Sequence, residues 1–171
     1  MNNQVYQAIR KLTANDNLAN FDCGQPALNQ FLQRFALNNQ KANSAQTYVC
    51  CLADQVVGFY SLAVGSIEAS TAPDRLIKGL PKHPVPVMIL ARLAVDVQHQ
   101  GLGLGLGAAL LKDALLRTTQ AADIAGIRAL LVHAKDDNIR NGYLNWEFEA
   151  SVTDPLHLFL LIKDLKTLLQ D

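Results

Sequence analysis

Residues 90–116 read LARLAVDVQHQGLGLGLGAALLKDALL, and this stretch decides how the rest of the chain is interpreted. It begins with an apolar run typical of a buried strand, has glycine at every second position from Gly101 to Gly107, and continues with leucines at helical spacing. Glycine has no Cβ, so such a loop lets backbone N–H groups approach a ligand closely. The helix start adds unpaired donors and the positive end of its dipole. The junction therefore predicts either a loop that binds phosphate or pyrophosphate, or only a tight, closely packed turn.

Two common phosphate-binding motifs do not fit this loop. A P-loop ends in Gly-Lys followed by Ser or Thr, whereas here Gly107 precedes Ala108 and Ala109. The dinucleotide fingerprint needs a glycine where Leu106 stands, and it belongs in an opening strand–helix–strand unit. We therefore expect neither hydrolysis of nucleoside triphosphates nor binding of a dinucleotide.

Length, charge and cysteine usage limit the class of protein. The chain has 171 residues and is 50% hydrophobic, which suits one domain with a sizeable core. Fifteen basic residues balance 15 acidic ones, so any anion-binding face must be local. Three cysteines without a Cys-x-x-Cys spacing favour neither a zinc site nor disulfides. Because the chain lacks a membrane-length apolar run and a signal-like start, we expect a cytoplasmic protein, a single domain over residues 1–171.

The hydrophobic pattern predicts helices interspersed among strands. Strands are expected at residues 4–12, 47–53, 56–64, 85–97, 127–133, 157–162 and from 148 onward, and helices from 25 into the polar stretch at 38–44, at 106–121 and at 136–144. Residues 70–84 are rich in proline and predict an irregular excursion, while 163–169 fit a strand end or a short helix. This order indicates an α/β or α+β layered domain with a mixed sheet.

The glycine loop matches the coenzyme A pattern of the GNAT N-acetyltransferases, Gln/Arg-x-x-Gly-x-Gly/Ala, at residues 98–103 and again at 100–105. Almost the whole chain, residues 12–165, resembles the toxin branch of the bacterial GNAT proteins. The segments that carry the resemblance are FDCGQPALNQFL, TYVCCLADQVVGFYSLAVGSIE, LPKHPVPVMILARLAVD, ALLVHAKDD and TDPLHLFLLIKDL. The resemblance implies a GNAT fold, with a mixed, mostly antiparallel, splayed sheet flanked by helices. It also implies acetyl-CoA-dependent acetylation of the amino group of aminoacyl-tRNA, which blocks translation.

The same resemblance assigns roles to individual residues. Tyr143 falls where the family places a general acid, and a phenol with a pKa near ~10 is protonated at cellular pH. Direct transfer from acetyl-CoA needs no metal and no protein nucleophile. The residues expected at the coenzyme are Leu93, Ala94 and Val95 for the pantetheine arm, and Gln100, Gly101, Leu102, Gly103, Leu104, Gly105, Leu106 and Gly107 for the pyrophosphate.

The resemblance further implies three partners: charged tRNA as acceptor, a DNA-binding antitoxin of the ribbon-helix-helix type, and a second copy of the chain in a homodimer. Basic residues that either converge on tRNA phosphates or are scattered solubilising charges are Arg34, Lys41, Arg75, Lys78, Lys82 and Arg92. His133 and His157 lie in apolar strand sequence, where we expect structural histidines.

The chain departs from the family pattern in two places. The glycine loop is two residues longer than the family pattern, which would displace the N–H groups that donate to the pyrophosphate. Near Tyr143, Gly142 replaces an aromatic residue and Glu147 replaces a glycine, so Glu147 is strained if that position needs a positive φ. Two other functions therefore stay open: a toxin relic that only binds partners, and a GNAT enzyme with a protein or small-molecule amine as acceptor.

Overall fold

The computed structural model describes residues 5–101 and 105–170, so Leu102, Gly103 and Leu104 of the expected coenzyme loop lie outside the described residues. The chain divides into two compact units. Unit 1 comprises Met1–Ala63 and Ala91–Ala114, and unit 2 comprises Val64–Leu90 and Leu115–Asp171. Among the described residues, no helix combines the length and the apolar character needed to cross a membrane.

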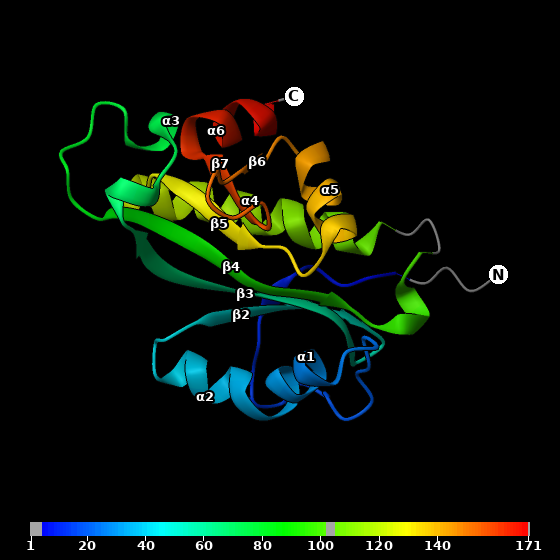
Figure 1. Ribbon diagram of the computed structural model, residues 1–171. Helices are drawn as coiled ribbons and strands as arrows, with labels where there is room; N and C mark the ends of the chain where they lie inside the picture. The colour runs from blue at the N-terminus through cyan, green and yellow to red at the C-terminus, as the bar shows by residue number, and fades with distance from the viewer. Residues whose placement is uncertain (1–4, 102–104, 171) are drawn as a thin grey trace. The chain divides into compact units, whose positions relative to one another are not determined.

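The strands hydrogen-bond in the order β1-β2-β3-β4-β5-β7-β6 (Figure 1). Strands β4 and β5 pair in parallel, whereas β1–β2, β2–β3, β5–β7 and β6–β7 are antiparallel, which confirms the expected mixed, mostly antiparallel sheet. The strands are β1 (Arg10–Lys11), β2 (Gln46–Leu52), β3 (Gln55–Ile67), β4 (Val85–Val95), β5 (Ala129–His133), β6 (Glu149–Ala150) and β7 (His157–Leu161). The helices are α1 (Pro26–Gln30), the π-helix η1 (Phe31–Phe35), α2 (Ala36–Lys41), α3 (Asp74–Ile77), α4 (Leu106–Ile124), α5 (Asp137–Asn145), α6 (Ile162–Gln170) and the short 3-10 helices η2 (Ala69–Thr71) and η3 (Val97–His99).

The hairpin between β2 and β3 turns one residue earlier than expected. Leu52 pairs with Gln55, so the two central residues are Ala53 and Asp54, with φ of 47° and 68°. Two positive φ values are the mark of a type I′ turn, whose twist matches that of the flanking strands. The strand pairing thus imposes this turn although no glycine is present.

In unit 1, α1, η1 and α2 follow one another along the β2–β3 hairpin (Figure 1). Phe35 continues the three- and four-residue spacing of Leu28, Phe31 and Leu32, which predicts that it is buried, but its side chain is 50% exposed and Ala36 is fully buried instead. The reason is η1, where Ala36 N–H bonds the carbonyl of Phe31 five residues back. One extra residue in a turn rotates everything after it, so the helical face shifts by one position.

The first turns of α4 pack closely on β3 within unit 1. A Cβ added at Gly58 would lie 2.9 Å from Leu110 Cδ1 and 3.4 Å from Leu106 Cδ2. Leu110 is fully buried and Leu106 is 5% exposed, so neither can easily move away. Glycine at position 58 therefore sets how closely α4 approaches the strand. Tyr60 adds a hydrogen bond from its hydroxyl to Asp113 on the same helix.

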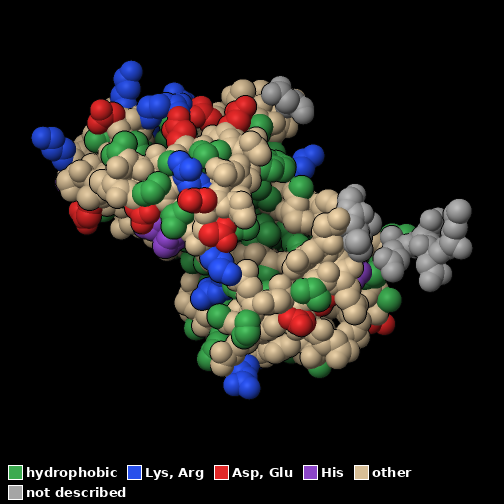
Figure 2. Space-filling model, turned by 45° about the vertical axis from the view of Figure 1, so that its right-hand side comes forward, with side chains coloured by type: hydrophobic (Ala, Val, Ile, Leu, Met, Phe, Trp, Pro, Cys, Tyr) green, Lys and Arg blue, Asp and Glu red, His purple; other side chains and the backbone are tan. Residues whose placement is uncertain are grey.

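Unit 2 has its own core, with Leu76, Val87 and Phe159 among its buried members. The proline-rich excursion contains α3, and residues 163–169 lie in α6, which settles the alternative left open by their sequence. Arg75 on α3 pairs with Glu149 on β6 and, at 2.9 Å, with Asp164 on α6. Basic and acidic side chains are also interspersed over the surface that Figure 2 shows.

Helix α5 ends in a Schellman motif. The N–H of Phe148 donates to the carbonyl of Tyr143 at 3.3 Å, and the N–H of Glu147 donates to that of Leu144 at 3.0 Å. The Tyr143 and Phe148 rings meet edge to face at 5.2 Å, which is the apolar contact that usually accompanies this motif. Glu147 occupies the left-handed position with a φ of 69°, where glycine is usual. The conditional expectation of strain at Glu147 is thereby confirmed.

Replacing Glu147 by glycine is expected to stabilise the protein. Glycine relieves roughly 1–2 kcal/mol of left-handed strain and loses about 0.4–1 kcal/mol to the freer unfolded chain. The net gain of about 1 kcal/mol raises the Tm by ~2–4 °C for a chain of this size, as differential scanning calorimetry would measure.

The matched control is Glu147→Ala, which removes the same charge but keeps a Cβ. It is expected to leave the Tm unchanged. An equal rise for both variants would show that the carboxylate, not the backbone conformation, is the source of the effect.

Candidate functional site

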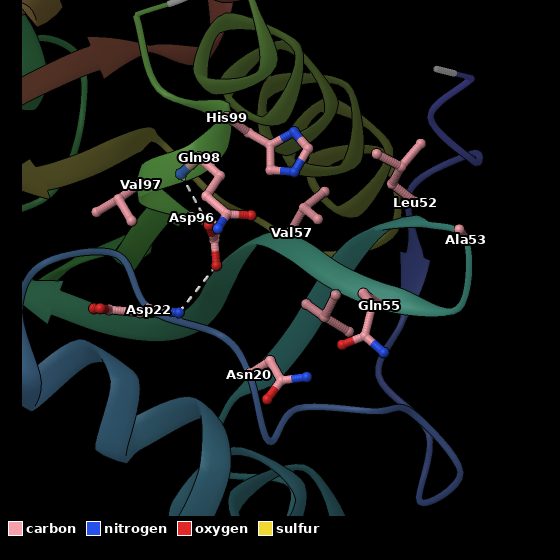
Figure 3. Close-up of a pocket in the computed structure, with 11 residues that line it drawn as sticks. Asn20, Asp22, Leu52, Ala53, Gln55, Val57, Asp96, Val97, Gln98 and His99 are labelled. Carbon is pink, nitrogen blue, oxygen red and sulfur yellow. Dashed lines mark hydrogen bonds between the residues drawn. The ribbon is translucent and has the colours of Figure 1, made fainter. Parts of the chain in front are cut away.

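The end of β4 is tied to its surroundings by Asp96, a buried acid that the sequence analysis did not single out. Its Oδ2 accepts a hydrogen bond from the N–H of Asp22 and its Oδ1 accepts one from the N–H of Gln98, both at 3.0 Å (Figure 3). Its own N–H donates to the carbonyl of Val57 on β3 at 2.8 Å. A lone acid directly after a long apolar strand was the available sequence signal. Asp96 fixes where the chain leaves β4 and starts η3.

The three β4 residues expected at the pantetheine arm lie just before this anchor. Ala94 is buried, while Leu93 and Val95 are half-buried. The side chain of Gln100, also expected at the coenzyme, turns back on the protein: its Nε2 donates to the carbonyl of Val95 at 2.6 Å and to that of Cys23 at 3.1 Å. Gln100 thus holds the start of the glycine loop against the end of β4.

The glycines that flank the undescribed part of the loop have a backbone that favours glycine. Gly101 and Gly105 have φ of 61° and 65°. A Cβ at either position would meet no described heavy atom within 4 Å, apart from its chain neighbours. Close packing against the described part of the chain therefore does not explain these glycines, but their backbone conformation does. This favours a ligand-binding loop over a closely packed turn.

Helix α4 begins directly after Gly105, whose carbonyl accepts the N–H of Ala109 at 2.9 Å. The first turn of any helix leaves its N–H groups without partners inside the helix. Leu106 and Gly107 contribute such groups, and the Leu106 side chain is buried. Gly107, expected in the loop, is the second residue of the helix. Because its side chain is buried, Leu106 can contact a ligand only through its backbone atoms.

A separate open cavity of about 600 Å³ lies in unit 1, between the β2–β3 turn, residues 20–22 and η3 (Figure 3). Its lining includes Asn20, Gln55 and His99, and His99 shares a 2.8 Å hydrogen bond with the hydroxyl of Tyr6. None of the described residues expected at the coenzyme lines this cavity. The cavity is therefore distinct from the residues expected at the coenzyme.

In unit 2, the side chain of Asp136 caps the start of α5 by accepting the N–H of Ile139 at 2.9 Å. The same helix presents Tyr143 in its last turn, half-buried against Phe148. Burial raises the pKa of Tyr143 to about 12, because the phenolate loses hydration. At neutral pH this phenol is a proton donor and not a base.

The six basic residues considered for tRNA are in different situations. Arg34, Lys41, Lys78 and Lys82 are exposed. Arg92 lies 3.7 Å from the centre of the Phe31 ring, and burial lowers the pKa of its guanidinium. Arg75 is neutralised by the two carboxylates described above, so its contacts fit a structural role and we remove it from the set.

No protein-family model matches the chain. A tRNA-acetylating toxin of Mycobacterium tuberculosis (strain ATCC 25618 / H37Rv) is 46% identical over 166 residues, which is 97% of this chain and 98% of that protein. The structure of AtaT complexed with acetyl-methionyl-tRNAfMet is 30% identical with a TM-score of 0.86 and covers 95% of this chain and 98% of AtaT. A tyrosine-to-phenylalanine mutant of AtaT bound to acetyl-CoA and the C-terminus of the antitoxin AtaR is 28% identical with a TM-score of 0.81, over 96% and 98% of the two chains. The chain therefore belongs to the tRNA-acetylating toxins, the toxin branch of the GNAT N-acetyltransferases.

Proposed function

We propose that this chain moves the acetyl group of acetyl-CoA to the amino group of an amino acid carried on charged tRNA. The neutral amine attacks the thioester carbonyl, an amide bond forms and the carbon–sulfur bond breaks. The amine gives up a proton and the thiolate takes one. The product can no longer take part in peptide bond formation as an acceptor, which accounts for the toxicity of such a protein.

The observation that carries the proposal is the pair of positive-φ glycines in front of α4. Gly101 and Gly105 both have positive φ, and a Cβ added at either would meet no described atom within 4 Å, apart from chain neighbours. The N–H groups of Gly105, Leu106 and Gly107 lie at the positive end of a 19-residue helix. Such groups suit the diphosphate of coenzyme A. The backbone of Leu93, Ala94 and Val95 would accompany the pantetheine arm.

Tyr143 is the proposed general acid. Its raised pKa keeps the proton on the phenol until the thiolate forms, and the thiolate is the group that needs it. The Schellman motif and the Phe148 ring fix the end of α5 on which it sits. A tyrosine was also the residue replaced in the AtaT mutant.

The proposal includes partners and setting. A DNA-binding antitoxin of the ribbon-helix-helix type would neutralise the toxin, and two copies of the chain would form a homodimer. Since β3, β4 and α4 each run through both compact units, we treat residues 1–171 as a single domain. The cytoplasm is the setting in which charged tRNA and acetyl-CoA meet.

The direct test offers the purified chain acetyl-CoA and a mixture of charged tRNAs. After nuclease digestion, mass spectrometry should find aminoacyl-adenosine heavier by one acetyl group. Uncharged tRNA, a peptide with a free N-terminus and a lysine-containing peptide are the competing acceptors. Acetylation of a peptide with none of the aminoacyl ester would replace tRNA by a protein acceptor, and no product with any acceptor would indicate a binding module.

The Tyr143→Phe variant is expected to lose about a hundredfold or more in turnover, the usual contribution of a positioned acid. Its Kd for acetyl-CoA should stay within twofold of the parent value, because only one hydroxyl is removed. Tyr48→Phe, which removes a phenol elsewhere in the chain, serves as the matched control. Full activity of Tyr143→Phe would exclude the acid role.

Turnover should not decline between about pH 7 and pH 10 through loss of the tyrosine proton. A group whose pKa is raised keeps its proton to higher pH, and that of Tyr143 is raised to about 12. The measurement is the initial rate against pH, corrected for spontaneous hydrolysis of the aminoacyl ester. A fall in rate below pH ~10 that is absent in Tyr143→Phe would contradict the assignment.

Two alanine substitutions of equal size test whether the loop conformation matters for coenzyme binding. Gly105→Ala places a Cβ at a residue with positive φ, which costs roughly 1–2 kcal/mol. We expect the backbone at residue 105 to change conformation to avoid this cost. Acetyl-CoA should then bind about tenfold more weakly. Gly126→Ala lies outside both the loop and α4, adds a Cβ that would meet no described atom within 4 Å, and should bind acetyl-CoA as the parent does. Equal affinities in calorimetry would show that the loop conformation does not matter.

A further inference from the structure

Two histidines and an aspartate come together in unit 2. The ligand atoms of His133, Asp154 and His157 all lie within 4.8 Å of one another. Their sequence positions suggested separate structural histidines. The pairing of β5 with β7 places His133 directly opposite His157, and the turn before β7 adds Asp154.

The spacing of this cluster suits a small metal ion. Nε2 of His157 lies 3.5 Å from Oδ2 of Asp154. Two ligands of a tetrahedral zinc ion, each about 2.0–2.1 Å from the metal, are themselves about 3.3 Å apart. The rings of His133 and His157 meet edge to face at 4.2 Å between centroids, and one nitrogen of each lies within 4.8 Å of the other and of an Asp154 oxygen.

The backbone around the cluster is already fixed. Oδ1 of Asp154 accepts the N–H of Leu156 at 3.0 Å, which leaves Oδ2 on the side of His157. The N–H of His157 donates to the carbonyl of Asp154 at 3.1 Å, and the N–H of Ala134 donates to the carbonyl of Leu156 at 2.7 Å. The three side chains are therefore held close together before any ion arrives.

We propose that His133, Asp154 and His157 bind one divalent transition-metal ion, with zinc as the first choice. Two imidazoles and a carboxylate suit zinc, nickel or copper better than magnesium or calcium, which prefer oxygen ligands. His133 is exposed and the other two residues are half-buried, so an ion can enter and water can complete its coordination.

The ion would act on structure and not on acetyl transfer, which needs no metal. It would tie the end of β5 to the turn at residues 154–157. The carbonyl of Pro155 in that turn accepts the Nε–H of Arg140 on α5 at 2.8 Å. Zinc would thus stiffen the support of the helix that carries Tyr143.

The test uses the full chain without a histidine tag and titrates zinc in competition with a chromophoric chelator. One equivalent should bind, magnesium should not compete, and the Tm should rise by roughly 5–10 °C at a hundred times the Kd. The double variant His133→Ala/His157→Ala should lose this binding. His83→Ala, an exposed histidine in the same unit, is the matched control and should retain it.

A second measurement keeps the proposal falsifiable if the double variant does not fold. Zinc added to the parent chain should shift the imidazole NMR signals of two of its four histidines, those of His133 and His157. Zinc binding that is unchanged in the folded double variant, shifts confined to His83 and His99, or no binding at all would each overturn the proposal.

Discussion

The N–H groups at the start of α4 can serve a ligand only because the helix begins where it does, and contacts within unit 1 fix that place. Gly58 lets the first turns approach β3 closely, with Leu110 in the space that a Cβ would fill. Asp96 fixes the end of β4 through three hydrogen bonds, and Gln100 secures the start of the loop. The end of β4 and the start of α4 are thus positioned by packing and hydrogen bonds that exist before coenzyme binds.

The end of α5 shows the opposite arrangement, because the residue proposed as general acid sits beside a strained backbone position. Tyr143 lies in the last turn of a helix whose C-terminal Schellman motif favours glycine at the left-handed position, where this chain has Glu147. Gly142 precedes Tyr143, and a Cβ added there would meet no described atom within 4 Å. Both features weaken the end of a short helix, and the Phe148 ring and the Schellman hydrogen bonds offset them. The zinc site proposed at β5 and β7 would add support to the same helix, through the hydrogen bond from Arg140 to the carbonyl of Pro155.

Much of the fold followed from hydrophobic periodicity, since buried strands and the α4 leucines carry strong local signals. The boundaries of the elements and the direction in which the helix faces after Phe35 could not be predicted from this periodicity. The π-helix that turns Phe35 outward depends on packing against the sheet, and the hairpin at Ala53-Asp54 depends on the strand register. Arg75 was set among nucleic-acid contacts because its carboxylate partners, Glu149 and Asp164, lie 74 and 89 residues away in sequence. The roles of Tyr143 and the loop glycines stay predictions, supported by a raised pKa and positive φ values.

The central physical claim is that backbone N–H groups at the start of α4 hold the phosphates of the coenzyme. The most direct measurement compares the affinities of acetyl-phosphopantetheine and acetyl-pantetheine for the unmodified chain, because the two ligands differ only in one phosphate. Charge-assisted hydrogen bonds of about 1.5–3 kcal/mol each predict that the phosphorylated ligand binds at least tenfold more tightly. Equal affinities would contradict the account.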